Sequence, residues 1–297
     1  MPLPTYSIIT ATLNAAGFVD RSLASVLRQS VPPRELIVVD GGSTDETRSI
    51  VERAARIRRR LGLEARVRVL QRAGGGLAGA WNRGIARSRG EVIFLLNADD
   101  WLEPDAARKA LARFESDPDV GIVHAKARIH DREGSALGVF APTLAHRMGL
   151  NCRTVHCSTF VRREVYERVG GFDSRFRTTL DFDFIERAWA AGIRFSFIDE
   201  VLANFRLGGI STLEVRRADW ETLLIGLRHS RTKLPPMLAY ALRRAVLRPL
   251  GFQGLRAWAT PEKSDLGWNA ELTGLDELEL RSTVARRPNR PVVASVG

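Results

Sequence analysis

The stretch Glu91-Val92-Ile93-Phe94-Leu95-Leu96-Asn97-Ala98-Asp99-Asp100-Trp101 joins a short apolar run to a cluster of acids. Such a run, without alternation, predicts a strand that is buried on both faces. Because open α/β sheets bind ligands at the carboxyl ends of their strands, the acids that follow are a candidate site. Hard carboxylate oxygens suit Mg²⁺ or Mn²⁺ held together with substrate phosphates. The competing interpretation is an acidic turn that caps the next helix, with Pro104 in its first turn.

Strands and helices alternate along the rest of the chain. Strands are predicted at residues 6–12, 35–39, 66–70, 155–161 and 194–198, with a hairpin at 120–130 and 135–140. Helices are predicted at residues 18–29, 44–60, 77–88 and 104–116, before the glycines at 170–171, and from about 179 to 191; residues 204–209 are predicted as a loop. This alternation predicts an α/β fold with a mostly parallel, doubly wound sheet and helices on both faces.

Composition limits the class of protein. The chain has 297 residues, 44% of them hydrophobic, and 45 Lys and Arg against 34 Asp and Glu give a net charge of +11. That charge favours an anionic partner such as a nucleotide or a phospholipid surface. No zinc-finger or RNA-binding signature accompanies it, so we expect no nucleic-acid partner. Two cysteines form no disulfide framework, and the lack of a signal peptide or a long apolar run favours a cytoplasmic protein.

Two glycine-containing loops are further candidates for ligand binding. Asp40-Gly41-Gly42-Ser43-Thr44-Asp45 ends a predicted strand, and its Asp40 and hydroxyls can bond a base or a ribose. An ordinary helix cap would use the same residues. Gly74-Gly75-Gly76 with Gly79 formally fits the dinucleotide fingerprint, but that fingerprint belongs to a first βαβ unit and not to a third strand. His156, in a predicted strand, can be a structural histidine or a ligand.

In combination these patterns resemble the family 2 glycosyltransferases of the GT-A fold, in particular the bacterial branch that decorates lipid-linked or surface polysaccharides. The matching segments follow the family order over residues 6 to about 212. They are residues 7–14, 36–45, 80–86 with Gly76, 94–100, 156–163, 170–173, 181–184 and 205–211.

The resemblance implies a nucleoside site. Thr12, Asn14 and Asp40 would hold the nucleoside, with Asp40 at the base or ribose, and Asn82 would lie beside the nucleotide. Gly79 departs from the family, in which close relatives often carry an acid at that position.

The same resemblance assigns the metal and the chemistry. Asn97 takes the first position of the family's metal motif, where an acid is usual, so it can bond a ribose but adds no charge. Asp99 would then be the main ligand of Mg²⁺ or Mn²⁺, with Asp100 behind it. Asp181 matches the family's catalytic base, and His156 would face the donor sugar or the acceptor.

The implied reaction is an inverting transfer of a sugar from a nucleotide-diphosphate sugar to a hydroxyl of a sugar or a lipid-linked glycan. The metal would neutralise the departing diphosphate while Asp181 takes the proton of the attacking hydroxyl. Two other functions stay open at this point: a catalytically silent nucleotide-sugar-binding protein of the same fold, and a nicotinamide-dependent oxidoreductase.

A basic segment follows the catalytic region. We expect the catalytic domain at residues 1–226, a helical segment at 227–280 and a disordered tail at 281–297. Seven cationic side chains and no acid occur from Arg228 to Arg256, and Pro235 and Pro236 would start a helix there. At ~100° per residue, one face of that helix is apolar. Its residues are Leu238, Ala241, Leu242, Ala245 and Val246. This stripe would either bind peripherally to the inner face of an anionic membrane or pack on the catalytic domain.

Overall fold

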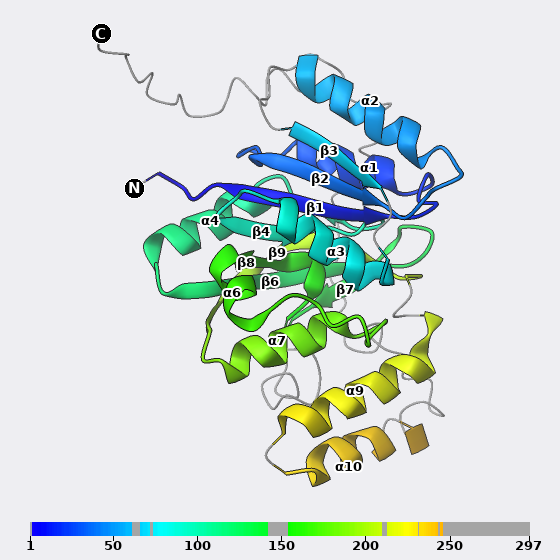
Figure 1. Cartoon of the computed structure of the whole chain (residues 1–297), viewed down its shortest axis with the longest axis vertical. Helices are drawn as coiled ribbons and strands as arrows, with labels where there is room; N and C mark the ends of the chain where they lie inside the picture. Colours follow the sequence, from blue (N-terminus) through cyan, green and yellow to red (C-terminus); the bar gives the residue numbers. More distant parts are fainter. Residues whose placement is uncertain are drawn as a thin grey trace.

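The computed structural model describes residues 2–60, 66–71, 74–141, 154–209, 213–230, 232–242 and 244–245. In this part of the chain the strands form one sheet with the order β3-β2-β1-β4-β8-β6-β9-β5, and β7 lies beside β6. Figure 1 shows helices on both faces of the sheet, as the sequence predicted. The strands are β1 (Tyr6–Thr12), β2 (Glu35–Asp40), β3 (Arg66–Gln71), β4 (Val92–Leu95), β5 (Trp101–Leu102), β6 (Val120–His130), β7 (Ala136–Phe140), β8 (Thr159–Arg162) and β9 (Arg194–Arg206).

The first half of the sheet is parallel, with β1 at its centre. β1 pairs with β2 on one side and with β4 on the other, and β2 pairs with β3. β2 and β4 are buried along their whole length, and β1 is buried except at Ala11. Because both faces of these strands are covered, their sequences are continuous apolar runs. The carboxyl ends of β1, β2 and β4 therefore meet at one edge of the sheet.

The second half adds antiparallel strands, so the whole sheet is mixed. β8 runs antiparallel between β4 and β6, β5 runs antiparallel to β9, and β6 pairs in parallel with β9. The predicted hairpin is confirmed as β6 and β7. Parallel neighbours require a long crossover, whereas the short turn between β6 and β7 permits only antiparallel pairing.

Two apolar cores lie on opposite faces of the sheet because successive side chains of a strand point to opposite sides. Ile8 belongs to the core beneath α1, α2 and α4, and Ile9 to the core beneath α3, α6 and α7. The helices are α1 (Val19–Leu27), α2 (Thr47–Arg60), α3 (Gly76–Arg87), α4 (Ala106–Ser116), α6 (Arg163–Val169), α7 (Leu180–Ala190), α9 (Val215–His229) and α10 (Leu234–Leu242), with a 3-10 turn, η1 (His156–Ser158).

The strand predicted at residues 155–161 is wrong in its first half. Residues 156–158 form η1, and β8 begins only at Thr159. The Ser158 hydroxyl donates to the carbonyl oxygens of Ala125 and Val155, and the Thr159 hydroxyl donates to the Val155 carbonyl at 2.7 Å. Such local hydroxyl-to-backbone bonds compete with strand pairing and hold the chain in a turn.

The loop predicted at residues 204–209 is also wrong in part, because β9 continues to Arg206. The polar side chain of Asn204 is buried. Its Nδ2 donates to Glu103 Oε1 at 3.0 Å, and its Oδ1 lies 2.9 Å from His130 Nε2. A polar residue in this sequence context indicated a loop, but here it links neighbouring strands inside the sheet.

Helices α9 and α10 lie beyond α7, at the end of the molecule opposite α2 (Figure 1). The helix predicted to start at Pro235 and Pro236 is confirmed as α10. The boundary expected after residue 226 falls inside α9, which is continuous from Val215 to His229. Val246 and the tail expected at residues 281–297 lie outside the described residues. None of the helices in the described ranges is both long and apolar enough to cross a membrane.

Candidate functional site

The loops that follow β1 and β2 are tied to each other by the residues expected to hold a nucleoside. The Thr12 hydroxyl donates to Asp40 Oδ1 at 3.3 Å. The Asn14 backbone N–H donates to Ser43 Oγ at 2.9 Å, and its side-chain oxygen accepts the Thr44 N–H at 2.9 Å. Asn14 adopts a positive φ of 49°, which an asparagine tolerates better than most residues. The structure therefore brings Thr12, Asn14 and Asp40 together.

Asp40 is a buried carboxylate held in its charged form. It is only 1% exposed, and burial opposes its ionisation. Hydrogen bonds from the Ser43 hydroxyl at 2.5 Å and from Arg48 Nε at 2.9 Å outweigh that effect and lower the pKa of Asp40 below its usual value. A cleft of about 210 Å³ opens beside it, between α2 and the end of the sheet. The residues that line the cleft are Thr12, Val38, Asp40, Thr47, Arg48, Val51, Glu52 and Val69.

Asn82 has a structural contact that the sequence did not predict. Its side-chain N–H₂ donates to the Phe172 carbonyl at 2.8 Å, and its side-chain oxygen accepts the Phe172 N–H at 2.7 Å. Gly171 permits this approach, because a Cβ atom at that position would lie 2.3 Å from Asn82 Oδ1. Asn82 thus ties α3 to the segment before α7. One amide hydrogen remains for a ligand.

The turn after β4 places Asp99 and Asp100 in different surroundings. Asp100 is 1% exposed; its Oδ1 accepts the Arg206 N–H and its Oδ2 accepts Asn97 Nδ2, both at 3.1 Å. Burial, together with the adjacent charge of Asp99, raises the pKa of Asp100 well above its usual value. Burial also raises the pKa of the half-buried Asp99, although the positive charge of Arg206 acts in the opposite direction. Asp99 is the more accessible carboxylate of the two.

The donor set at this turn fits a metal held jointly by protein and substrate. Among the described residues there is no group of three or more His, Cys, Asp or Glu side chains that could hold a metal by themselves. Asp99 offers one hard carboxylate, and Mg²⁺ commonly takes one or two carboxylates together with phosphate oxygens. The two oxygens of Asp100 already bind Asn97 and Arg206, so its observed role is to fix the turn.

Asp181 and Asp183 stand in the first turn of α7 but differ in their partners. Asp181 is half-buried, and its Oδ1 accepts the Phe182 N–H at 2.9 Å. Burial raises the pKa of Asp181 to about 6. Asp183 is fully buried and forms ion pairs with Arg187 at 2.8 Å and with Arg228 at 3.3 Å. These two acids are therefore not interchangeable: one keeps a high proton affinity and the other is a charged structural anchor.

Cys157 lies within electrostatic range of both sets of acids. Its thiol is completely buried, which raises its pKa, and the charges of Asp100, Asp99 and Asp181 raise it further. All three carboxylates thus act on the same buried residue. The turn after β4 and the start of α7 therefore both lie within electrostatic range of Cys157.

His156 is stacked on Trp81, a residue that sequence reasoning missed. The two ring centroids are 4.5 Å apart with an interplanar angle of 26°. Burial lowers the pKa of His156 to about 4, so the ring is neutral at pH 7. His156 Nε2 and Trp81 Nε1 are both buried and lack a hydrogen-bond partner among the described residues. Two unsatisfied ring nitrogens on a stacked pair can bond a polar ligand.

Glu221 of α9 is a second residue that sequence reasoning missed. Its carboxylate accepts the backbone N–H groups of Arg177, Thr178 and Thr179 at 3.0, 2.8 and 3.2 Å, and the Thr178 hydroxyl at 2.7 Å. These groups immediately precede α7, where a helix favours a negative charge. Arg217 Nε holds the same carboxylate from the other side at 2.8 Å. The local pair with Arg217 does not reveal this role, because the backbone groups that Glu221 binds lie about forty residues earlier.

Comparisons with known proteins identify the family. The family model described as glycosyl transferase family 2 matches residues 7–170. The chondroitin synthase of Pasteurella multocida (strain Pm70) is 26% identical over 212 residues, which cover 71% of this chain and only 21% of that relative. This chain therefore spans about a fifth of the length of that synthase. The PGL/p-HBAD biosynthesis glycosyltransferase of Mycobacterium bovis (strain BCG / Pasteur 1173P2) is 29% identical over 214 residues, 71% of this chain and 80% of the relative.

Solved structures share the fold. S. aureus TarS 1-349 in complex with UDP-GlcNAc aligns with a TM-score of 0.60 at 18% identity, over 83% of this chain and 76% of that one. The mannosyltransferase PcManGT from Pyrobaculum calidifontis, in complex with GDP-Man and Mn²⁺, aligns with a TM-score of 0.62 at 21% identity, over 86% of this chain and 74% of that one.

Proposed function

This chain belongs to the glycosyl transferase family 2 and is a glycosyltransferase with a GT-A-like fold, and we propose that it is an inverting, divalent-metal-dependent one. It would move a sugar from a nucleotide-diphosphate sugar to a hydroxyl of a sugar or a lipid-linked glycan, in the synthesis of a bacterial cell-surface polysaccharide or glycolipid. The observation that carries the proposal is that Asp99, the accessible carboxylate after β4, and Asp181, at the start of α7, both act electrostatically on the buried Cys157.

Asp181 is the proposed catalytic base. With a pKa of about 6 it is mostly ionised at neutral pH yet retains enough proton affinity to take the proton of an attacking hydroxyl. Its carboxylate is bonded by the backbone N–H groups of Phe182 and of Asp181 itself, whereas Asp183 is bound by the cations Arg187 and Arg228. A single base without a second nucleophilic carboxylate suits one direct displacement, which inverts the anomeric centre.

Asp99 is the proposed metal ligand, and the donor's diphosphate would supply further oxygens. A bound Mg²⁺ or Mn²⁺ would neutralise charge on the leaving diphosphate. The Mn²⁺ in the complex of PcManGT supports this assignment. Asp100 would keep Asp99 in place through its bonds to Asn97 and Arg206.

The remaining sequence-predicted residues form the proposed donor site. Thr12, Asn14 and Asp40 would bind the nucleoside beside the 210 Å³ cleft. Asn82 would contribute its free amide hydrogen, and Asn97 a ribose contact. His156 would face the donor sugar or the acceptor. UDP-GlcNAc in the TarS complex and GDP-Man in the PcManGT complex support a nucleotide-sugar donor.

Neither alternative function gains support. Membership of a glycosyltransferase family argues against the nicotinamide hypothesis. The position of the glycine pattern, after β3 and not after the first strand, argues against it as well. The proposed metal ligand Asp99 and the proposed base Asp181 are both present in the sequence, which favours an enzyme over a silent binding protein. We further propose that the enzyme acts in the cytoplasm, where a buried free thiol such as Cys157 stays reduced.

Thermal unfolding in the presence of nucleotides tests the proposal. UDP or GDP with Mn²⁺ should raise the unfolding midpoint by about 5 °C at saturation, and Asp99→Ala should remove the Mn²⁺-dependent part of that rise. Asp199→Ala is the control, because Asp199 is an exposed acid paired with Lys126 on the surface. No shift with either nucleotide would refute the donor site. An unchanged Mn²⁺-dependent shift in Asp99→Ala would refute the metal assignment.

A further inference from the structure

Helices α9 and α10 carry an unusual share of the exposed apolar side chains. Seven of the twelve large hydrophobic residues that are exposed in the described part of the chain lie between residues 213 and 242. They are Leu213, Trp220, Leu224, Leu234, Met237, Leu238 and Leu242. We refer to these seven residues as the α9–α10 face. Exposed apolar residues that gather on two neighbouring helices are a candidate interaction site.

The two helices are fixed to each other and to the protein through their other sides. Pro236 of α10 is buried against Gly226 of α9, where an added Cβ would lie 2.9 Å from the proline ring. The rings of Trp220 and Tyr240 meet edge-on with centroids 6.2 Å apart. On α10, Leu234, Leu238 and Leu242 therefore lie opposite the buried Pro236 and face away from α9.

This answers, for the described residues, the question that the sequence left open. Leu238, Ala241, Leu242 and Ala245 are all exposed. They do not pack on the catalytic domain, as one interpretation of the stripe required. Among the described residues, nothing buries the apolar stripe of α10.

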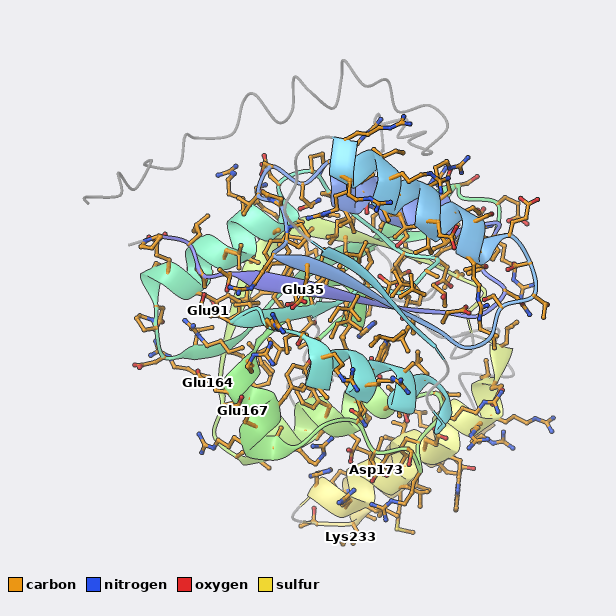
Figure 2. The ribbon with its side chains drawn as sticks, turned by 45° about the horizontal axis from the view of Figure 1, so that its top comes forward. Glu35, Glu91, Glu164, Glu167, Asp173 and Lys233 are labelled. Carbon is orange, nitrogen blue, oxygen red and sulfur yellow. The ribbon has the colours of Figure 1, made fainter. Side chains whose placement is uncertain are left out.

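On these two helices the acidic side chains are buried and the exposed charged side chains are cationic. Asp219 and Glu221 are each only 4% exposed and are directed into the protein. The exposed charged side chains of the described residues from 215 to 245 are all cationic: Arg216, Arg217, Arg228, Lys233 and Arg244. Figure 2 shows Lys233 at the outer end of the molecule, while Asp173 lies on the inner side of α9, where it contacts Arg228. The two acids of α9 are thus buried, and the partly exposed Glu214, which precedes α9, is neutralised by an ion pair with Arg177 at 2.9 Å.

Cations also flank the apolar residues along α9. At ~100° per residue, Trp220 and Leu224 lie between Arg216 on one flank and Arg217 and Arg228 on the other. An apolar strip bordered by cations is the arrangement of helices that lie in a membrane interface. Tryptophan is especially suited to the depth of the lipid headgroups.

We propose that the α9–α10 face docks on an anionic phospholipid membrane. Apolar side chains would enter the headgroup region while Arg216, Lys233 and Arg244 pair with lipid phosphates. Arg217 and Arg228 are already paired with acids of the protein and would contribute only long-range attraction. A second copy of the chain is a poorer occupant, because a symmetric contact would set the same cations against each other. The proposal goes beyond the glycosyltransferase activity and does not depend on which sugar is transferred.

Liposome flotation of the full chain tests the proposal. The protein should float with vesicles of phosphatidylglycerol and phosphatidylcholine, should stay behind with phosphatidylcholine alone, and should be released by high salt. Trp220→Glu and Leu238→Glu, one from each helix, should each weaken the apparent affinity roughly tenfold or more. Trp189→Glu is the matched control, because Trp189 is 52% exposed and Trp220 51% exposed.

Three results would overturn the proposal. The first is absence of flotation at low salt. The second is equal loss with Trp189→Glu, which would mean that the binding does not run through this face. The third is a dimer in light scattering that Trp220→Glu dissolves, which would make the face a contact between copies. We would measure the thermal unfolding midpoint of each variant in parallel, so that only folded proteins are compared. The shift of that midpoint with nucleotide reports donor binding separately, so failure of docking and failure of the proposed activity remain distinguishable.

Discussion

Replacing Asp181 by Asn should make the protein more stable while it removes activity. Burial raises the pKa of this carboxyl from 3.8 to about 6, so the folded state disfavours the charge. By the equivalence of pKa and free energy, ionised Asp181 lowers the free energy of unfolding by about 3 kcal/mol at pH 7. Asn is nearly isosteric and neutral, so Asp181→Asn should recover most of that amount.

The sign of the effect fixes its pH dependence. Because the folded-state pKa is the higher one, the penalty is absent below about pH 4 and grows until the pH passes about 6. The two proteins should therefore have equal stability near pH 3.5 and differ most at pH 7 and above. The same group sets the activity of the parent protein: kcat/KM should fall about tenfold per pH unit below pH 6 as the base becomes protonated.

Urea unfolding at several pH values, together with sugar-transfer assays, measures both consequences. Asp181→Asn should lose activity by roughly 10²–10⁴-fold without loss of nucleotide binding. Asp183→Asn is the matched control and should behave in the opposite way. Its buried ion pairs with Arg187 and Arg228 would be broken, at a cost of about 3 kcal/mol in unfolding free energy. A destabilised or fully active Asp181→Asn protein would refute the assignment of the base.

Two more predictions concern the supports of the site. Glu221→Gln should lower the unfolding free energy by about 2 kcal/mol at pH 7, because a charged acceptor of several hydrogen bonds at the start of α7 becomes neutral. Since these bonds lower the pKa of Glu221, the deficit should fade below about pH 4, whereas the exposed Glu164→Gln should show no deficit. Gly171→Ala should cost about 2 kcal/mol or more through its clash with Asn82, while Gly17→Ala, which has open space, should be tolerated; equal urea midpoints for the two alanine variants would contradict this account.

The parallel half of the sheet could be predicted because its information is local. Val92 to Leu95 is buried on both faces, and a strand of that kind must be apolar at every position. The polar loop that begins at Asp40 follows directly from the end of such a strand. Thr12 and Asn14 were expected near Asp40, and the structure brings them there through bonds between neighbouring strand ends.

The contacts that the sequence could not predict are those whose partners lie far away in the chain. Asp100 was expected behind a metal, but the Arg206 backbone, more than a hundred residues later, occupies one of its oxygens. Asn82 was expected at the nucleotide, and its amide is mostly used by the Phe172 backbone. Local propensity carries no information on such pairings, since their energy comes from burial of both partners together.

Helix α9 shows what a domain boundary drawn from composition alone overlooks. The change to a basic composition suggested a division after residue 226, within the helix. Yet Glu221 holds the start of α7, and Arg228, past that division, pairs with Asp183 two residues from the proposed base. The outer side of the same helix presents Trp220 to solvent. A helix is only about 10 Å across. A membrane bound to the outer side of α9 would therefore lie about one helix diameter from the start of α7, which carries Asp181.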